Sequence, residues 1–150
     1  MEARRLATFK RIELEDIEAI SRVHRDACLL AYRFMNWSYP LQEVEDWYSQ
    51  KFLGWTWTLA AICPETRIVG FIAMIGLHID QLFVDPACQR LRVGSQLLRA
   101  AIHAHPGRLT LDVFEENLGA RAFYEEHGFS ACDRWMNEEE GVVDLLYVRE

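Results

Sequence analysis

The chain has 150 residues, of which 51% are hydrophobic and 12% aromatic, and a formal net charge of −7. This length suits one domain with a substantial core and is too short for a two-domain enzyme. The acidic balance disfavours a nucleic-acid-binding protein, which would normally show a basic face, and it fits a site that attracts cationic substrates such as amines.

Targeting and cysteine patterns point to an ordinary soluble protein. The sequence has no apolar run of about 18 residues or more, the length that spans a bilayer, and its first residues lack the apolar middle of a signal peptide. We therefore expect a cytoplasmic protein with no membrane partner. The four cysteines are widely spaced without a C-x-x-C pair, so neither a zinc site nor a redox motif is indicated, and we expect reduced thiols.

The first third of the chain predicts one strand and two helices. Residues Leu6 to Phe9 read as a strand. Apolar residues then recur every three or four positions from Asp16 to about Ala31 or Arg33, which predicts an amphipathic helix. A second, shorter helix is expected from about Leu41 to Phe52. The aromatic stretch between the two helices has no clear period.

Three β-rich runs follow and predict an antiparallel meander. The first two, Trp55 to Cys63 and Ile68 to Ile75, are joined by a Pro-Glu-Thr-Arg hairpin signal. The third is a central strand that begins near His78 and ends at about Val84, because Asp85-Pro86 cannot continue a sheet.

A basic loop connects this central strand to a helix. The loop reads QRLRVGS, in which Arg90 and Arg92 carry positive charge and Gly94 lets the backbone approach a ligand closely. The apolar face of the following helix is formed by residues 97, 98, 101 and 102, and the helix ends before Pro106-Gly107. A helix N-terminus carries unpaired N–H groups and roughly half a positive charge, so this junction is a candidate seat for a phosphate or pyrophosphate.

The last third of the chain predicts three strands and one helix. Leu109 to Val113 alternate as a strand, which should run parallel to the central strand because a helical crossover precedes it. Asn117 is a suitable helix N-cap and Gly128 a suitable residue after the helix end. Two further strands, Ser130 to Met136 and Val142 to Val148, flank an acidic turn. The Glu138 to Glu140 run of that turn has no metal-ligand spacing and reads as a surface feature.

Two motifs in this order resemble those of the GNAT superfamily of N-acetyltransferases. The first is the loop after the central strand, where Gln89 and Gly94 match the family pattern but Arg92 replaces its first glycine. The second is Asn-x-x-Ala-x-x-Phe-Tyr-x-x-x-Gly-Phe, which matches at every position from Asn117 to Phe129. The resemblance implies an α/β fold in which a mixed, twisted sheet of six or seven strands is flanked by about four helices, as a single domain over residues 1–150.

The resemblance also implies a function, namely transfer of an acetyl group from acetyl-CoA directly to an amine of a small molecule or peptide, with no metal. Backbone N–H groups at the loop and helix start would bind the pyrophosphate, and the free edge of the central strand and the second motif would bind the pantetheine arm. A side chain at position 92 either obstructs close backbone approach or supplies a guanidinium that binds a phosphate. The expected cofactor-binding residues are Leu82, Phe83, Val84, Gln89, Arg90, Leu91, Arg92, Val93, Gly94, Ser95, Asn117 and Tyr124.

Three residues are candidates for the chemistry. Tyr124 matches the family's usual general acid, which protonates the departing thiolate. His78 and Asp80 fall where relatives in this superfamily carry the residues that deprotonate the amine, and a neutral imidazole suits that task near pH 7. Asp80 could orient the imidazole, bind the cationic substrate or pass the proton through water. The alternatives are that His78 is a hydrogen-bonded strand residue and Tyr124 a packing residue whose hydroxyl is bonded locally.

The aromatic stretch supplies the acceptor-pocket candidates Tyr32, Phe34, Trp37 and Tyr39, although core or interface packing explains each one singly. Exposure of Trp37, Trp47 or Trp55 would indicate a homodimer. The rival functions are a non-catalytic acyl-CoA sensor of the same fold, suggested by Arg92, and a nucleotide-binding α/β module, which the lack of a Gly-rich first turn disfavours.

Overall fold

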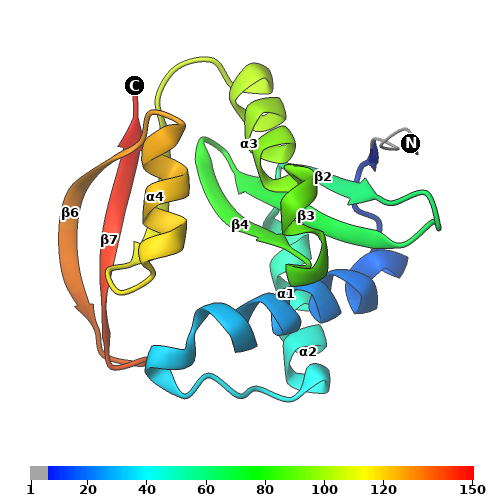
Figure 1. Cartoon of the computed structure of the whole chain (residues 1–150), viewed down its shortest axis with the longest axis horizontal. Helices are drawn as coiled ribbons and strands as arrows, with labels where there is room; N and C mark the ends of the chain where they lie inside the picture. Colours follow the sequence, from blue (N-terminus) through cyan, green and yellow to red (C-terminus); the bar gives the residue numbers. More distant parts are fainter. Residues whose placement is uncertain (1–6) are drawn as a thin grey trace.

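A seven-stranded mixed sheet with strand order β1-β2-β3-β4-β5-β7-β6 forms the centre of the molecule (Figure 1). The computed structural model describes residues 7–150, apart from the side chains of Gln89 and Arg90. The predicted first strand therefore begins outside the described residues, at Leu6. The strands are β1 (Thr8–Lys10), β2 (Trp57–Ile62), β3 (Ile68–Ile75), β4 (His78–Val84), β5 (Leu109–Phe114), β6 (Ser130–Asn137) and β7 (Val142–Arg149).

Strand directions follow the order of the chain. Strands β1 to β4 form an antiparallel meander, β5 runs parallel to β4 after a helical crossover, and β7 and β6 complete the sheet as an antiparallel pair. This confirms the predicted fold class, the meander and the parallel fifth strand. The four cysteines are unpaired, as expected.

Four α-helices flank the sheet (Figure 1). Helices α1 (Ile17–Ala31) and α2 (Leu41–Lys51) pack over one part of the sheet, where Ile20, Val44 and Tyr48 form a core with Phe71 of β3. Helices α3 (Val93–Ala104) and α4 (Leu118–Glu126) belong to a second core. The helix boundaries agree with the predicted ones within about two residues.

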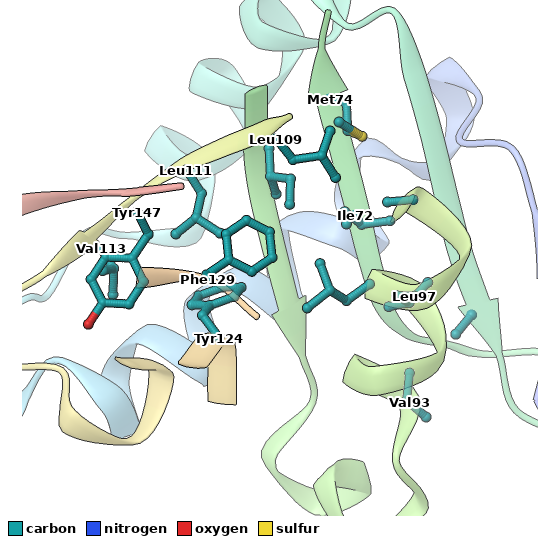
Figure 2. Packing of buried hydrophobic residues seen from close by; sticks show 14 of the residues in the cluster. Ile72, Met74, Val93, Leu97, Leu109, Leu111, Val113, Tyr124, Phe129 and Tyr147 are labelled. Carbon is teal, nitrogen blue, oxygen red and sulfur yellow. The ribbon is translucent and has the colours of Figure 1, made fainter. Parts of the chain in front are cut away.

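The second core holds α3 and α4 to the strands that carry the site. Figure 2 shows its side chains, with Leu97 of α3 near Ile72 of β3, and Tyr124 of α4 near Phe129. Leu97, Leu109 and Leu111 are 0–1% exposed. Each such buried side chain contributes roughly 1.5–3 kcal/mol through removal of apolar surface from water. The starts of both helices are therefore fixed relative to β4 and β5.

Two irregularities in β4 create space beside it. Pairing with β5 is limited to His78 with Thr110 and Ile79 with Leu111, although both strands continue, so β4 and β5 diverge beyond this point. In the pairing with β3 the register shifts where Asp80 stands, because Gln81 and Ile79 oppose consecutive β3 residues. Asp80 is thus the extra residue of a β-bulge.

Left-handed backbone marks the start of α3. A 3-10 helix over Pro86–Leu91 ends at Arg92, which has φ 57° and ψ 28° and is also the residue before α3. Left-handed conformation is normally taken by glycine, which explains why the family pattern has glycine at this position.

Among residues 7–150, no helix has the length and apolar character needed to cross a bilayer.

Candidate active site

The divergence of β4 and β5 opens into a cleft of about 1590 Å³ that runs across the sheet. One end of the cleft is formed by the start of α3 and the exposed side of α4. The other end is formed by α1, α2, the connection between them, and the β6–β7 turn. The cleft therefore joins the predicted cofactor seat to the predicted acceptor region, with the ends of β4 and β5 between them.

The start of α3 fits a pyrophosphate. No side chain caps this helix end, so the first N–H groups of the helix, at residues 93 to 95, are not satisfied by a capping residue. A Cβ atom built on Gly94 would come within 3.5 Å of Phe123 and Val84, in ordinary contact, so the fold itself does not require glycine here. The absence of a side chain instead leaves the cleft wall open at the helix start.

Arg92 lies at this end of the cleft with its side chain exposed. Within the described part of the chain its guanidinium makes no hydrogen bond or ion pair. Arg99 lines the same end. These two arginines make the α3 end of the cleft the more positive one.

The other predicted cofactor residues divide by position. Leu82, Phe83 and Val84 of β4 line the cleft along the edge that has parted from β5. Ser95 and Asn117 also line the cleft, and the Asn117 side chain accepts from the Ala120 N–H at 3.3 Å as the predicted N-cap of α4. Of the predicted residues whose side chains are described, two do not line it: Val93, whose side chain is 1% exposed in the core, and the exposed Leu91. The predicted side chains of Gln89 and Arg90 lie outside the described part of the structure.

Tyr124 lies at the middle of the cleft. Its ring packs against Phe123 and Phe129, and the residue is 9% exposed. Burial raises the pKa of its hydroxyl above the ordinary value of 10.0. Among residues 7–150 no protein group hydrogen-bonds this hydroxyl, so the local hydrogen bond of the packing alternative is not seen, although the ring itself is packed. The phenol is protonated near pH 7 and available to donate into the cleft.

His78 also lines the cleft, where its ring is held by β5. Its Nδ1 atom is 2.7 Å from Thr110 Oγ1, and its Nε2 atom is 3.9 Å from Asp112 Oδ2. Partial burial raises the pKa of Asp112, and the nearby His78 opposes that shift. The His78 side chain is 36% exposed, so solvent can reach it.

Asp80 has different partners from those expected. Its Oδ1 atom accepts from Lys51 Nζ at 3.0 Å, and its Oδ2 atom accepts from Trp55 Nε1 at 2.9 Å. The interpretation in which Asp80 orients the His78 ring is therefore wrong, because both carboxylate oxygens bond to other groups and β5 holds the ring. Asp80 still lines the cleft, with a side chain that is 11% exposed.

His24 is a cleft residue for which the sequence predicts only a place on the first amphipathic helix. The Tyr48 hydroxyl lies 2.5 Å from its Nδ1 atom and 3.3 Å from Gln81 Oε1. Burial lowers the pKa of His24 to about 3, so the ring is neutral near pH 7 and holds a proton weakly. His24 is consequently a poorer proton acceptor than a solvent-accessible histidine. Its position on the apolar face of α1, beside Val23, was the only signal available.

The aromatic stretch contributes three of its four predicted pocket residues. Tyr32, Trp37 and Tyr39 line the cleft. Phe34 does not line it and packs against Tyr32 and Phe114 with ring centroids 6.0 and 6.2 Å apart. Trp47 is 43% exposed but also lines the cleft, so its exposure gives no separate support for the homodimer expected from exposed tryptophans.

The acidic turn between β6 and β7 reaches the cleft, although the sequence predicted only a surface role for it. Glu139 and Glu140 line the acceptor end, and the Tyr39 hydroxyl donates to Glu140 Oε1 at 3.2 Å. Figure 1 shows the turn beside the connection between α1 and α2. The carboxylates that line the acceptor end come from α2, β4, β5, the β6–β7 turn and β7: Glu43, Asp80, Asp112, Glu139, Glu140 and Asp144. Lys51 of α2 also lines this end and pairs with one of these carboxylates, that of Asp80.

Sequence comparisons agree with this geometry. Residues 25–129 match the model of the family described as Acetyltransferase (GNAT) family. The peptidyl-lysine N-acetyltransferase YjaB of Salmonella typhimurium strain LT2 is 30% identical over 146 residues, which cover 95% of this chain and 99% of that protein. The peptidyl-lysine N-acetyltransferase YiaC of Escherichia coli K12 is 28% identical and covers 68% of this chain and 67% of its own length.

Solved structures show the same fold. The solution structure of apo-form YjaB from Escherichia coli superposes with a TM-score of 0.79 at 26% identity, covering 96% of this chain and 97% of that one. A PaiA N-acetyltransferase from Thermoplasma acidophilum in complex with coenzyme A gives a TM-score of 0.69 at 18% identity, covering 97% and 99% of the two chains. At that identity the second likeness concerns the fold alone.

Proposed function

This chain belongs to the GNAT family of acetyltransferases, and we propose that its acceptor is the side-chain amine of a lysine in a peptide or protein. The observation that carries the proposal is the acceptor end of the cleft, where carboxylates from five segments surround aromatic faces. Such a surface attracts an ammonium group and its apolar stem. The relatives named peptidyl-lysine N-acetyltransferases support the same substrate class.

The enzyme is an N-acetyltransferase that uses acetyl-CoA as its acyl donor. The cofactor end of the cleft fits this donor, because an uncapped helix start, an open wall at Gly94 and two arginines suit a pyrophosphate. When bound, acetyl-CoA supplies the acetyl group as a thioester. Membership of this family removes the nucleotide-binding module as a rival.

We assign the binding of acetyl-CoA to main-chain groups and two side chains. The N–H groups of residues 93 to 95 would bind the pyrophosphate, and the Arg92 guanidinium would add a charge-assisted contact. The edge of β4 from Leu82 to Val84 would pair with the pantetheine arm as a strand does, since β5 leaves this edge free. Asn117 would contact the same arm from the start of α4.

The acceptor amine has to lose a proton before it can attack, because an ammonium has no lone pair. His78 is the proposed base, since its imidazole is solvent-accessible and is held by Thr110 and Asp112. A positive imidazolium formed there would be stabilised by the Asp112 carboxylate. Asp80 takes the second of its expected roles, which is to bind the cationic acceptor.

The sulfur has to gain a proton as the thiol leaves. Tyr124 is the proposed donor, because it lines the cleft and its hydroxyl is protonated and has no protein partner in the described structure. General acid catalysis of this kind typically contributes about 10²–10⁴-fold. The combination of a donor here and a base at His78 supports an enzyme over the acyl-CoA sensor that Arg92 suggested.

The substrate proposal is tested with purified protein, acetyl-CoA and a panel of acceptors. The panel comprises a peptide with one lysine and a blocked N-terminus, the same peptide with arginine in place of lysine, an unblocked peptide without lysine, a polyamine and an arylalkylamine. Thiol release measures turnover and mass spectrometry locates the acetyl group. We expect the highest kcat/KM with the blocked lysine peptide and no product with its arginine counterpart. A higher kcat/KM with an α-amine, a polyamine or an arylalkylamine would overturn the lysine proposal.

A further inference from the structure

Asp80 presents one oriented carboxylate oxygen to the acceptor end of the cleft. The bulge in β4 directs Asp80 toward α2 and the segment after it, where the Trp55 indole N–H donates to Oδ2 at 2.9 Å. This hydrogen bond fixes the plane of the carboxylate. The remaining oxygen, Oδ1, lies 3.0 Å from Lys51 Nζ. Because the Asp80 side chain is only 11% exposed, leaving its carboxylate without a cationic partner would cost free energy.

Lys51 is held in the way that a substrate ammonium would be held. Its Nζ atom contacts the Asp80 carboxylate and lies 5.0 Å from the centroid of the Trp47 ring. A carboxylate together with an aromatic face is the combination that binds ammonium ions. All three residues line the cleft. The chain has only one other lysine, Lys10, which pairs with Asp16 at 2.6 Å and does not line the cleft.

We propose that Asp80 and Trp47 form the seat for the acceptor's ammonium group and that Lys51 occupies this seat as a tethered competitor until the acceptor displaces it. The inference rests on the proposed function, because it takes the acceptor to be a cationic lysine side chain. Exchange of one ammonium for another keeps the Asp80 carboxylate paired throughout, which avoids the cost of an unpaired buried charge. A neutral amine does not compensate the carboxylate, so it leaves Lys51 in the seat and reaches the thioester without entering it.

The competitor lowers the apparent affinity for cationic acceptors. A site that is free for only a fraction of the time binds its ligand more weakly by that fraction. The Lys51 side chain is 30% exposed, so solvent screens its pairing with Asp80, and we take the pairing as about 1 kcal/mol, which corresponds to roughly five-fold in affinity. Removal of the Lys51 charge should therefore lower KM for a lysine peptide by about that factor.

The test compares charge removal at the two lysines of the chain. Lys51→Met keeps the apolar stem and removes the ammonium, Lys51→Arg keeps a cation, and Lys10→Met removes the lysine that lies outside the cleft. Steady-state kinetics are measured with the blocked lysine peptide and with aniline, an amine that is uncharged at the assay pH and does not cleave the thioester unaided. We expect KM for the lysine peptide to fall about five-fold in Lys51→Met alone, with no fall in KM for aniline. Addition of Asp80→Asn to Lys51→Met should raise KM for the peptide again.

The outcomes separate the two proposals. A KM for the lysine peptide that is unchanged or higher in Lys51→Met overturns the competitor, as does an equal fall for the charged and the neutral acceptor. A wild-type protein that acetylates another amine class in preference to lysine overturns the proposed substrate instead. Melting temperatures of the variants, compared with that of Lys10→Met, show whether any loss of activity comes from unfolding.

Discussion

Arg92 gives the sharpest test of how the cofactor end works, because its backbone conformation and its charge have separable effects. With φ 57° and ψ 28°, the residue pays the steric cost of the left-handed region, which is roughly 1–2 kcal/mol for a residue with a Cβ atom. Arg92→Gly removes this cost. Glycine is also more flexible than arginine in the unfolded chain, which lowers the unfolding free energy by about 0.4–1 kcal/mol. The net gain in unfolding free energy is about 1 kcal/mol, or a rise of roughly 2–4 °C in melting temperature.

Arg92→Ala is the matched control, since it removes the guanidinium but keeps the Cβ atom and the strained backbone. The exposed guanidinium is expected to contribute about 1 kcal/mol to acetyl-CoA binding, so both variants should bind roughly five-fold more weakly by isothermal titration calorimetry. Only Arg92→Gly should melt at a higher temperature than wild type in scanning calorimetry. Equal melting temperatures for the two variants would refute the strain argument. Tighter acetyl-CoA binding by Arg92→Gly would show that the side chain obstructs the seat and would refute a phosphate contact.

Further predictions concern Tyr124, His24 and the acidic turn of the cleft. Tyr124→Phe should lower kcat by about 10²-fold or more with little change in KM for acetyl-CoA, and unchanged turnover would remove Tyr124 from the mechanism. Because burial raises the pKa of Tyr124 above 10.0, deprotonation of this hydroxyl should not lower the wild-type rate as pH rises to 10. A fall in the wild-type rate below pH 10 that is missing in Tyr124→Phe would contradict the assignment. Since burial lowers the pKa of His24 from 6.5 to about 3, the unfolded state binds a proton between these values and the folded state does not, so stability present above pH 6.5 is lost as pH falls toward 3. Urea titrations should show that the free energy of unfolding falls by up to about 1.4 kcal/mol per pH unit in this range, and His24→Gln should make this fall less steep. An equally steep fall in the variant would show that another group causes it. Finally, Glu139→Gln with Glu140→Gln should raise KM for a lysine peptide about two- to five-fold at low salt and less at high salt, whereas a rise that is independent of salt would argue against electrostatic attraction.

The cofactor end could be predicted from the sequence because main-chain features form it. Asp85-Pro86 ends β4, an apolar period marks α3, and Asn117 and Gly128 bound α4. Each of these signals depends on residues close together in the chain, so spacing alone located the end of β4 and the two helix starts, whereas the free edge of β4 was expected from the family resemblance. The left-handed backbone at position 92 was hidden, because arginine gives no indication of it.

The position of Asp80 shows what the sequence could not reveal about β4. Strict alternation places His78 and Asp80 on one face of a regular strand, and it places Gln81 on the other. The bulge changes this, because Asp80 and Gln81 both contact α2, through Lys51 and Tyr48. The bulge depends on how β4 pairs with β3, and no residue pattern within β4 predicts it. The partners of Asp80 were therefore unpredictable even though the residue itself was singled out.

The acceptor end depends on side chains from segments that are far apart in the chain. Tyr39 meets Glu140 across about a hundred positions, and Lys51 meets Asp80 across 29. Neither pair belongs to a shared motif, so periodicity could place each residue on its own element but not beside its partner. The two ends of the cleft consequently differ in how they can change. The start of α3 forms with an arginine in place of a glycine, whereas a single charge substitution at Lys51 or Glu140 should alter which amines the enzyme accepts.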